Sequence, residues 1–146
     1  MFKATRLRAV ITTALLLSGF CAITTARAAA PAEPLKVLVF WGSFCSNCPA
    51  VMRQMDALRE QYGDRNVQFV AVSLEGEEAP QQYLARKGYG FHIKTDGDAL
   101  LARYQAVGVP WVVLTDAAGN AIANPSRGGA PREVADKLRL ELDLRT

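Results

Sequence analysis

Two cysteines separated by two residues have the type and spacing that a redox reaction needs. Cys45 and Cys48 enclose Ser46 and Asn47, and Pro49 follows them. Disulfide exchange requires one thiolate that attacks and a second thiol that releases the mixed disulfide. At the start of a helix, unpaired backbone N–H groups and the helix dipole favour a thiolate on the first cysteine. We therefore predict Cys45 as the nucleophile and Cys48 as the resolving thiol.

Three other uses of this pair are weak, and a fourth stays open. A disulfide that closes a four-residue loop adds little stability. A zinc site needs four ligands, which the pair and the single histidine, His92, cannot supply within one chain. A haem attachment site needs histidine directly after the second cysteine, where Pro49 stands. Cu(I) accepts two thiolates, so a Cu(I)-binding or metallochaperone module is the alternative to a redox enzyme. If the protein is a redox enzyme, we expect it to use no metal and no cofactor.

The residues on either side of the pair predict a strand followed by a helix. Residues 35–41 form a short apolar run rich in β-branched and aromatic side chains, which is typical of a buried strand. After the pair, apolar side chains recur at helical spacing, at Val51, Met55, Leu58 and Tyr62. Pro49 is tolerated in the first turn of a helix, and Gly63 is expected to end this one. The cysteines therefore lie where a buried strand meets an amphipathic helix.

The rest of the sequence alternates between strand and helix patterns. Strands are expected at 67–74 and 111–114, with a short extended piece at 91–93 and a hairpin strand at 121–124. Helices are expected at 78–87, at 99–105 with Asp98 as the N-cap, and at 131–142. This order predicts an α/β domain with a mixed central sheet and helices on both faces. The cysteine pair would lie at the carboxyl edge of the parallel strands, where ligands usually bind.

The first 28 residues have the features of a secretory signal peptide. Lys3, Arg6 and Arg8 form a positively charged start, and residues 9–26 carry no charge. Residues 26–28, Ala-Arg-Ala, have the small-x-small pattern that signal peptidase recognises, so we expect cleavage after residue 28. The alternative is an uncleaved membrane anchor, because an uncharged segment of this length is close to the lower limit for crossing a bilayer.

This division of the chain changes both the cysteine count and the net charge. We expect a signal peptide at 1–28, a tether at 29–34 and one domain at 35–146. Cys21 would leave with the leader, so the domain keeps an even number of cysteines, which suits an oxidising compartment. Four of the 17 basic residues are in the leader, which leaves 13 against 14 acidic residues and a net charge of −1. We therefore expect a periplasmic or secreted protein and no nucleic-acid partner.

The residues around the pair resemble the active site of a known superfamily. Residues 40–48, FWGSFCSNC, are similar to the FWxxWCxxC segment of thioredoxins, especially those of the exported TlpA-like branch. Gly108-Val109-Pro110 resembles the second landmark of these proteins, a proline preceded by a cis peptide bond, and residues 114–120 resemble their strand-turn-strand hairpin. The resemblance covers about residues 35–142. It implies a thioredoxin fold and a thiol–disulfide oxidoreductase activity.

The resemblance also implies a substrate site and a class of partner. Val109 and Pro110 would lie beside the cysteines, and the backbone of Val109 would pair with an extended segment of the substrate. Phe44 would form an apolar lip next to Cys45. The implied partners are proteins that carry thiols or disulfides, together with a membrane redox partner, and we expect a monomer. No charged residue lies between the cysteines, which favours a reductant or an electron relay over an oxidant.

Three positions depart from the pattern of this superfamily. Phe44 replaces the usual Trp before the first cysteine, and so keeps an apolar side chain without an indole N–H. Val39 stands where thioredoxins carry a buried Asp, and Val51 stands where TlpA-like proteins often carry Glu. Such a carboxylate would help Cys48 to gain and lose its proton. Either water or another residue takes over that step, or the protein is a slower or specialised exchanger. Glu75, at the expected end of a strand, is the first residue to examine.

Overall fold

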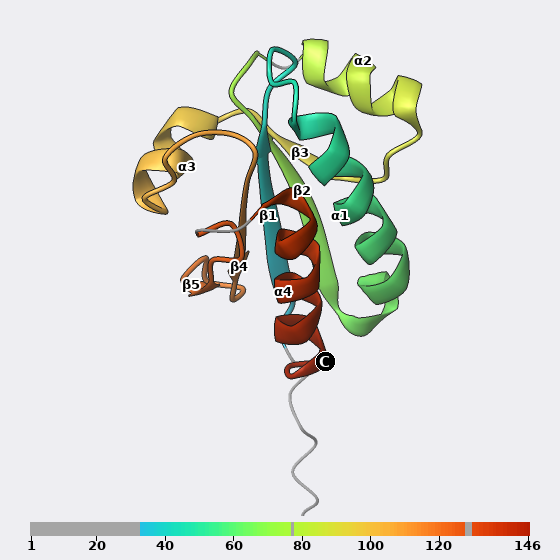
Figure 1. The fold of residues 1–146 in the computed structure, drawn as a ribbon, viewed down its shortest axis with the longest axis vertical. Helices are drawn as coiled ribbons and strands as arrows, with labels where there is room; N and C mark the ends of the chain where they lie inside the picture. The colour runs from blue at the N-terminus through green and yellow to red at the C-terminus, as the bar shows by residue number, and fades with distance from the viewer. Residues whose placement is uncertain (1–32, 77, 128–129) are drawn as a thin grey trace, which may run out of the picture. The chain divides into compact units, whose positions relative to one another are not determined.

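A mixed sheet lies at the centre of the fold in the computed structural model, which describes residues 33–76, 78–127 and 130–146 (Figure 1). The sheet has five strands. Its strands are β1 (Leu35–Trp41), β2 (Val67–Ser73), β3 (His92–Lys94), β4 (Trp111–Thr115) and β5 (Ala121–Ala123). They lie in the order β3-β2-β1-β4-β5. β1, β2 and β3 are parallel, whereas β4 runs antiparallel to β1 and β5 antiparallel to β4. The predicted signal peptide and most of the tether lie outside the described residues.

β1 is the central strand and is buried on both faces. Residues 37–41 have exposed fractions of at most 5%, which explains their unbroken apolar run. Val39 pairs with Ala71 of β2 on one side and with Val112 of β4 on the other. The strand therefore brings its last residue, Trp41, to the carboxyl edge of the sheet in a fixed register.

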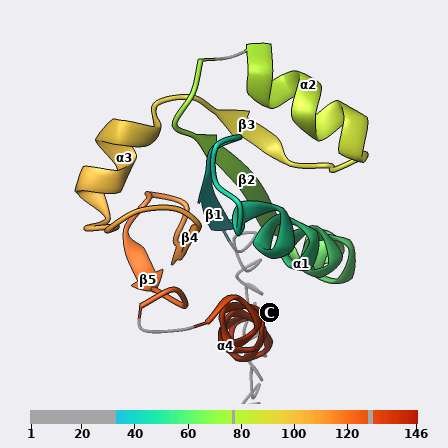
Figure 2. The same cartoon turned by 45° about the horizontal axis from the view of Figure 1, so that its top comes forward.

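Helices cover both faces of the sheet, as the sequence predicts. Alternate β1 side chains Val37, Val39 and Trp41 belong to one core, together with residues of α1 (Cys48–Tyr62), α2 (Glu78–Lys87) and α4 (Pro131–Asp143). The intervening Leu38 and Phe40 belong to a second core beneath α3 (Gly97–Arg103). Figure 2 shows α3 across the sheet from α1 and α4. None of the helices among the described residues has the length and apolar character needed to cross a membrane.

The predicted N-cap of the third helix is wrong. α3 begins at Gly97 with Asp96 as its N-cap, so Asp98 lies in the first turn. A Cβ atom at Gly97 would lie 2.3 Å from the backbone oxygen of Ser73. Glycine therefore lets the helix start against the end of β2, and this contact cannot be read from local capping patterns. The helix also ends at Arg103, before Gln105, whose φ of 53° is left-handed.

Candidate active site

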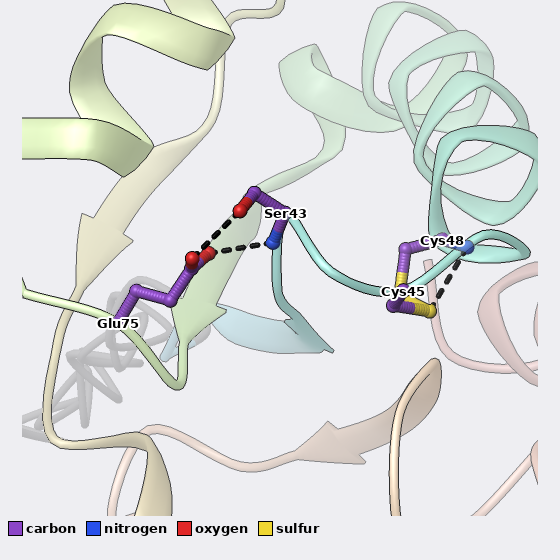
Figure 3. Close-up of a disulfide and its surroundings, with 4 residues drawn as sticks. All are labelled: Ser43, Cys45, Cys48 and Glu75. Atoms are coloured by element: carbon purple, nitrogen blue, oxygen red, sulfur yellow. Dashed lines mark hydrogen bonds between the residues drawn. A yellow bond between two sulfur atoms is a disulfide. The ribbon is translucent and has the colours of Figure 1, made fainter.

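Cys45 and Cys48 lie together at the carboxyl edge of β1. The strand ends at Trp41, a short loop carries Cys45, and α1 begins at Cys48. A disulfide joins the two residues, whose Cα atoms are 5.4 Å apart (Figure 3). The strand and the helix that the sequence predicts on either side of the pair therefore hold both sulfurs at one point.

The surroundings of the two cysteines differ. Cys48 is 1% exposed and belongs to the core between the sheet and α1. Cys45 is half-buried and only partly covered by that core. The backbone N–H of Cys48 donates a hydrogen bond to Cys45 Sγ, with an N···S distance of 3.1 Å. An incoming sulfur can therefore reach Cys45 more easily than Cys48, and a negative charge on Cys45 would face the N-terminus of α1.

Cys45 occupies the place of a capping side chain at the start of α1. The N-cap residue Asn47 makes no side-chain capping hydrogen bond. The N–H of Cys48 instead approaches both the Sγ and the backbone oxygen of Cys45, the latter at 3.2 Å. Pro49 in the first turn has no N–H that needs a partner. The helix N-terminus is thus directed at the sulfur that the sequence predicts as nucleophile.

A cleft of about 360 Å³ lies at the start of α1, and a loop distant in sequence forms part of its lining. Its lining residues are Asn47, Val51, Val107, Gly108, Val109, Pro110, Trp111, Ser126 and Val134. The peptide bond between Val109 and Pro110 is cis. The Ser126 hydroxyl accepts a hydrogen bond from the N–H of Val112 at 2.7 Å, which ties the loop after β5 to the start of β4. Val109 and Pro110 therefore share one cleft with Asn47, the residue before Cys48.

The cleft contains residues that sequence reasoning missed. Val107 is 88% exposed and borders the cleft, although an isolated valine in a predicted loop gives no functional signal. Nothing in the sequence points to a role for Ser126, and Val134 is predicted only as part of the helix at 131–142. Their positions follow from the packing of α4 and the β5–α4 loop against β4, which no local pattern predicts.

Phe44 lies at the surface beside Cys45 and not among the residues that line the cleft. Its side chain is 68% exposed. A Cβ atom at Gly42 would lie 2.4 Å from Phe44 Cε1, so the aromatic ring rests against the glycine. Phe44 thus presents an apolar side chain next to Cys45, on a loop that depends on Gly42 for space.

The carboxylate positions of the superfamily are apolar here. Val39 is fully buried and Val51 is 1% exposed, both in the same core as Cys48. Glu75 is directed at Ser43 and not at the sulfurs (Figure 3). His92 is exposed on the edge strand β3. Within the described residues, no three His, Cys, Asp or Glu side chains gather in a way that could hold a metal ion.

Comparisons with known proteins agree with this geometry. The model of the AhpC/TSA family matches residues 22–122. The thiol-disulfide oxidoreductase ResA of Halalkalibacterium halodurans is 28% identical over 103 residues, which are 69% of this chain and 58% of ResA. This chain therefore spans little more than half the length of that relative.

Two solved structures show the fold. A thiol:disulfide interchange protein from Bacteroides sp. has a TM-score of 0.61 at 16% identity, with 76% of this chain and 74% of that chain covered. The thioredoxin of Wuchereria bancrofti has a TM-score of 0.57 at 20% identity, with 76% and 83% covered. Together with the strand order above, they confirm the predicted fold. The chain belongs to the AhpC/TSA family and has a thioredoxin-like fold.

Proposed function

We propose that this protein is a thiol–disulfide oxidoreductase that exchanges Cys45 and Cys48 with protein substrates outside the cytoplasm. The observation that carries the proposal is the unequal exposure of a bonded cysteine pair at the start of α1. Cys45 is half-buried with its sulfur against a backbone N–H, whereas Cys48 is buried. The name of the relative ResA, a thiol-disulfide oxidoreductase, supports the same reaction.

In the reducing direction, the reaction begins with the Cys45 thiolate. It attacks a sulfur of the substrate disulfide, the substrate S–S bond breaks, and the released sulfur leaves as a thiolate that takes up a proton. Cys48 then loses its proton and attacks Cys45 Sγ in the mixed disulfide. The second substrate thiol leaves, so the substrate gains two electrons and two protons while Cys45 and Cys48 become the disulfide. A dithiol donor must reduce this disulfide before the next cycle.

The cleft supplies the surface on which a substrate segment would lie. The backbone of Val109, in the bend at residues 108–110 before β4, would pair with an extended substrate segment by β-augmentation. Pro110 and Val51 contribute apolar side chains to the cleft, and the exposed Phe44 offers an apolar contact next to Cys45. We therefore assign substrate binding to Phe44, Val109 and Pro110.

The proposed role is that of a reductant or electron relay. Ser46 and Asn47 carry no charge that would stabilise a Cys45 thiolate further, so nothing between the cysteines favours a strong oxidant. A membrane redox partner would recharge a reductant of this kind outside the cytoplasm, and the protein would act as a monomer. The direction of electron transfer depends on the difference in reduction potential between this protein and its partners. For a two-electron couple, a difference of about 30 mV corresponds to about 1.4 kcal/mol. Measuring the reduction potential in a thiol buffer therefore tests whether the protein is a reductant.

Trapping of mixed disulfides tests the function. Cys48→Ser should accumulate mixed disulfides through Cys45 because the resolving thiol is missing. Cys45→Ser should accumulate few, because the remaining thiol is buried. Non-reducing gels and peptide mass spectrometry identify the linked cysteine. If neither variant traps partners and the reduced protein instead binds Cu(I) tightly, the pair serves as a copper site and the redox proposal is wrong.

A further inference from the structure

Glu75 binds the loop that carries Cys45. The loop residue Ser43 donates two hydrogen bonds to the Glu75 carboxylate, from its backbone N–H to Oε2 at 2.5 Å and from its hydroxyl to Oε1 at 2.7 Å (Figure 3). Both carboxylate oxygens are therefore used on one residue, two positions before Cys45. Hydrogen bonds to a charged acceptor are stronger than those between neutral groups.

Glu75 is itself held firmly by the edge of the sheet. Its N–H donates to the hydroxyl of Ser73 at 3.0 Å, and Ser73 is fully buried at the end of β2. The N–H of Leu74 donates to the backbone oxygen of Trp41 at 3.1 Å, which joins the ends of β2 and β1. The carboxylate thus extends from a rigid part of the fold toward a loop that is mostly exposed to solvent.

The loop needs such an anchor. Ser43 and Phe44 are exposed, and Gly42 contributes no side chain to packing. Within the loop, the N–H of Cys45 donates to the backbone oxygen of Gly42 at 3.1 Å, which closes a turn but does not attach it to the sheet. The Ser43–Glu75 hydrogen bonds make that attachment, across 32 positions of sequence.

We propose that Glu75 is a positioning residue that, through Ser43, keeps the Cys45 sulfur against the N–H of Cys48 at the N-terminus of α1. The inference rests on the proposed function, because it concerns the reactivity of the same thiol. If the loop moves, Cys45 leaves the backbone donor that favours its thiolate, and the attacking sulfur is no longer fixed relative to the cleft. Small misplacements of a reacting group have large effects on rate.

Two substitutions of Glu75 separate its hold on the loop from its charge. In Glu75→Gln, the amide oxygen can accept from the Ser43 N–H and the amide nitrogen can interact with the Ser43 hydroxyl, so the hold persists without the charge. Glu75→Ala removes both. Loss of the negative charge alone would favour the Cys45 thiolate, whereas loss of position would disfavour it. The two effects therefore have opposite signs in the pH dependence of Cys45 reactivity.

The experiment uses the reduced exported protein, from which Cys21 is expected to be removed with the leader. It measures the reaction rate with the disulfide probe 5,5′-dithiobis(2-nitrobenzoic acid) and the pH profile of Cys45 alkylation by iodoacetamide. We expect Glu75→Ala to react about tenfold more slowly at neutral pH, with the midpoint of its alkylation profile above that of Glu75→Gln. Glu75→Gln should stay within about twofold of the wild type. The control is Glu78→Ala, an exposed carboxylate in the first turn of α2, which should behave as the wild type.

Several results would overturn the proposal. Equal rates for Glu75→Ala and the wild type would reject it. Equal slowing by Glu75→Gln would also reject it, because that variant keeps the hold on Ser43, and so would slowing by the control Glu78→Ala. If near-UV circular dichroism shows that Glu75→Ala does not fold, Ser43→Ala replaces it. That variant removes one of the two hydrogen bonds, and a wild-type rate would reject the proposal. A wild type whose Cys45 forms no mixed disulfide would instead reject the proposed function, whatever Glu75 does.

Discussion

Cys48 must release its proton from a buried position in an apolar core. Val39 and Val51, the two positions at which the sequence resemblance leads us to expect a carboxylate, are buried in the same core. Glu75, the other residue considered for this step, is bound to Ser43. Desolvation disfavours the charged form of a buried thiol, so the step in which Cys48 attacks the mixed disulfide should depend strongly on pH.

Restoring a carboxylate next to Cys48 should speed up that step. In the wild type, resolution of the mixed disulfide should be slow near neutral pH and should accelerate as the solution becomes alkaline and Cys48 ionises. Val51→Glu should raise the rate near neutral pH, because Val51 also borders the cleft and a carboxylate there can exchange protons with solvent. Stopped-flow measurement of the resolution step across pH checks the prediction.

The matched control for this substitution is Val51→Gln, which has the same size and polarity but cannot take up a proton. It should lower stability without raising the neutral rate. Both variants place a polar group at a buried position, so their folding must be verified by thermal unfolding. A wild-type resolution rate that is already fast, and flat from mildly acidic to mildly alkaline pH, would contradict the idea that Cys48 lacks assistance.

Between elements, a hydrogen bond links the ends of α1 and α4. The hydroxyl of Tyr62, the last residue of α1, donates to Oδ1 of Asp143 at the end of α4 with an O···O distance of 2.5 Å. Tyr62 is fully buried. Burial raises the pKa of the Tyr62 hydroxyl above its usual value of 10.0, and the hydrogen bond to Asp143 and the charge of that carboxylate raise it further. The bond thus helps to hold the helix that carries Cys48 against α4.

Removing this hydrogen bond should destabilise the fold and change its response to alkali. Tyr62→Phe should lower the free energy of unfolding by about 1–3 kcal/mol, as expected for a bond to a charged acceptor. Because the folded-state pKa of Tyr62 is raised, its contribution is complete below the unfolded value of 10.0 and declines as the pH rises beyond it. Urea unfolding of both proteins at several pH values should therefore show that the difference between their free energies of unfolding decreases above that pH.

Tyr104→Phe is the control for this prediction. The Tyr104 hydroxyl donates to the backbone oxygen of Gly119 at 2.9 Å, a neutral acceptor at the β4–β5 turn. Its loss should lower the free energy of unfolding by about 1 kcal/mol. If Tyr62→Phe lowers stability no more than this control does, and the difference from the wild type stays constant into alkali, then the Tyr62–Asp143 bond does not have the proposed role.

For the chain as a whole, the distribution of charge and the predicted leader concern the compartment in which the protein acts. The predicted leader, residues 1–28, carries four basic and no acidic residues, and the remainder is nearly neutral. The proposed role outside the cytoplasm requires export, which the predicted leader would provide. The cleft and the exposed Phe44 and Val107 would then be available to extended protein segments.

Export should produce a chain that begins at Ala29. Expression of the full sequence in a Gram-negative bacterium, followed by mass analysis of the periplasmic fraction, measures the new N-terminus. Ala28→Phe should block processing, because signal peptidase requires a small residue at that position, whereas Ala22→Phe lies outside the pattern and should not. A chain that retains Met1 and stays in the membrane would show that the leader acts as an anchor.

Much of the architecture was predictable because it depends on neighbours in sequence. The apolar run of β1, the helical periodicity of α1 and the cysteine spacing each express local geometry, and the structure confirms those elements within a residue or two. The start of α3 was predicted incorrectly because it depends on the approach of Gly97 to Ser73, a contact between different elements. Such contacts leave no periodic pattern in the sequence.

Residue types and spacing were enough to predict the chemistry of the site: two thiols, three positions apart, between a buried strand and a helix. The atoms that surround these thiols depend on how the chain folds. The tertiary structure placed Val107 and Ser126 at the cleft, and turned Glu75 from a possible proton carrier for Cys48 into the partner of Ser43. The reason is physical: helix and strand propensities act over a few residues, whereas a cleft and a loop anchor arise where segments distant in sequence pack against each other.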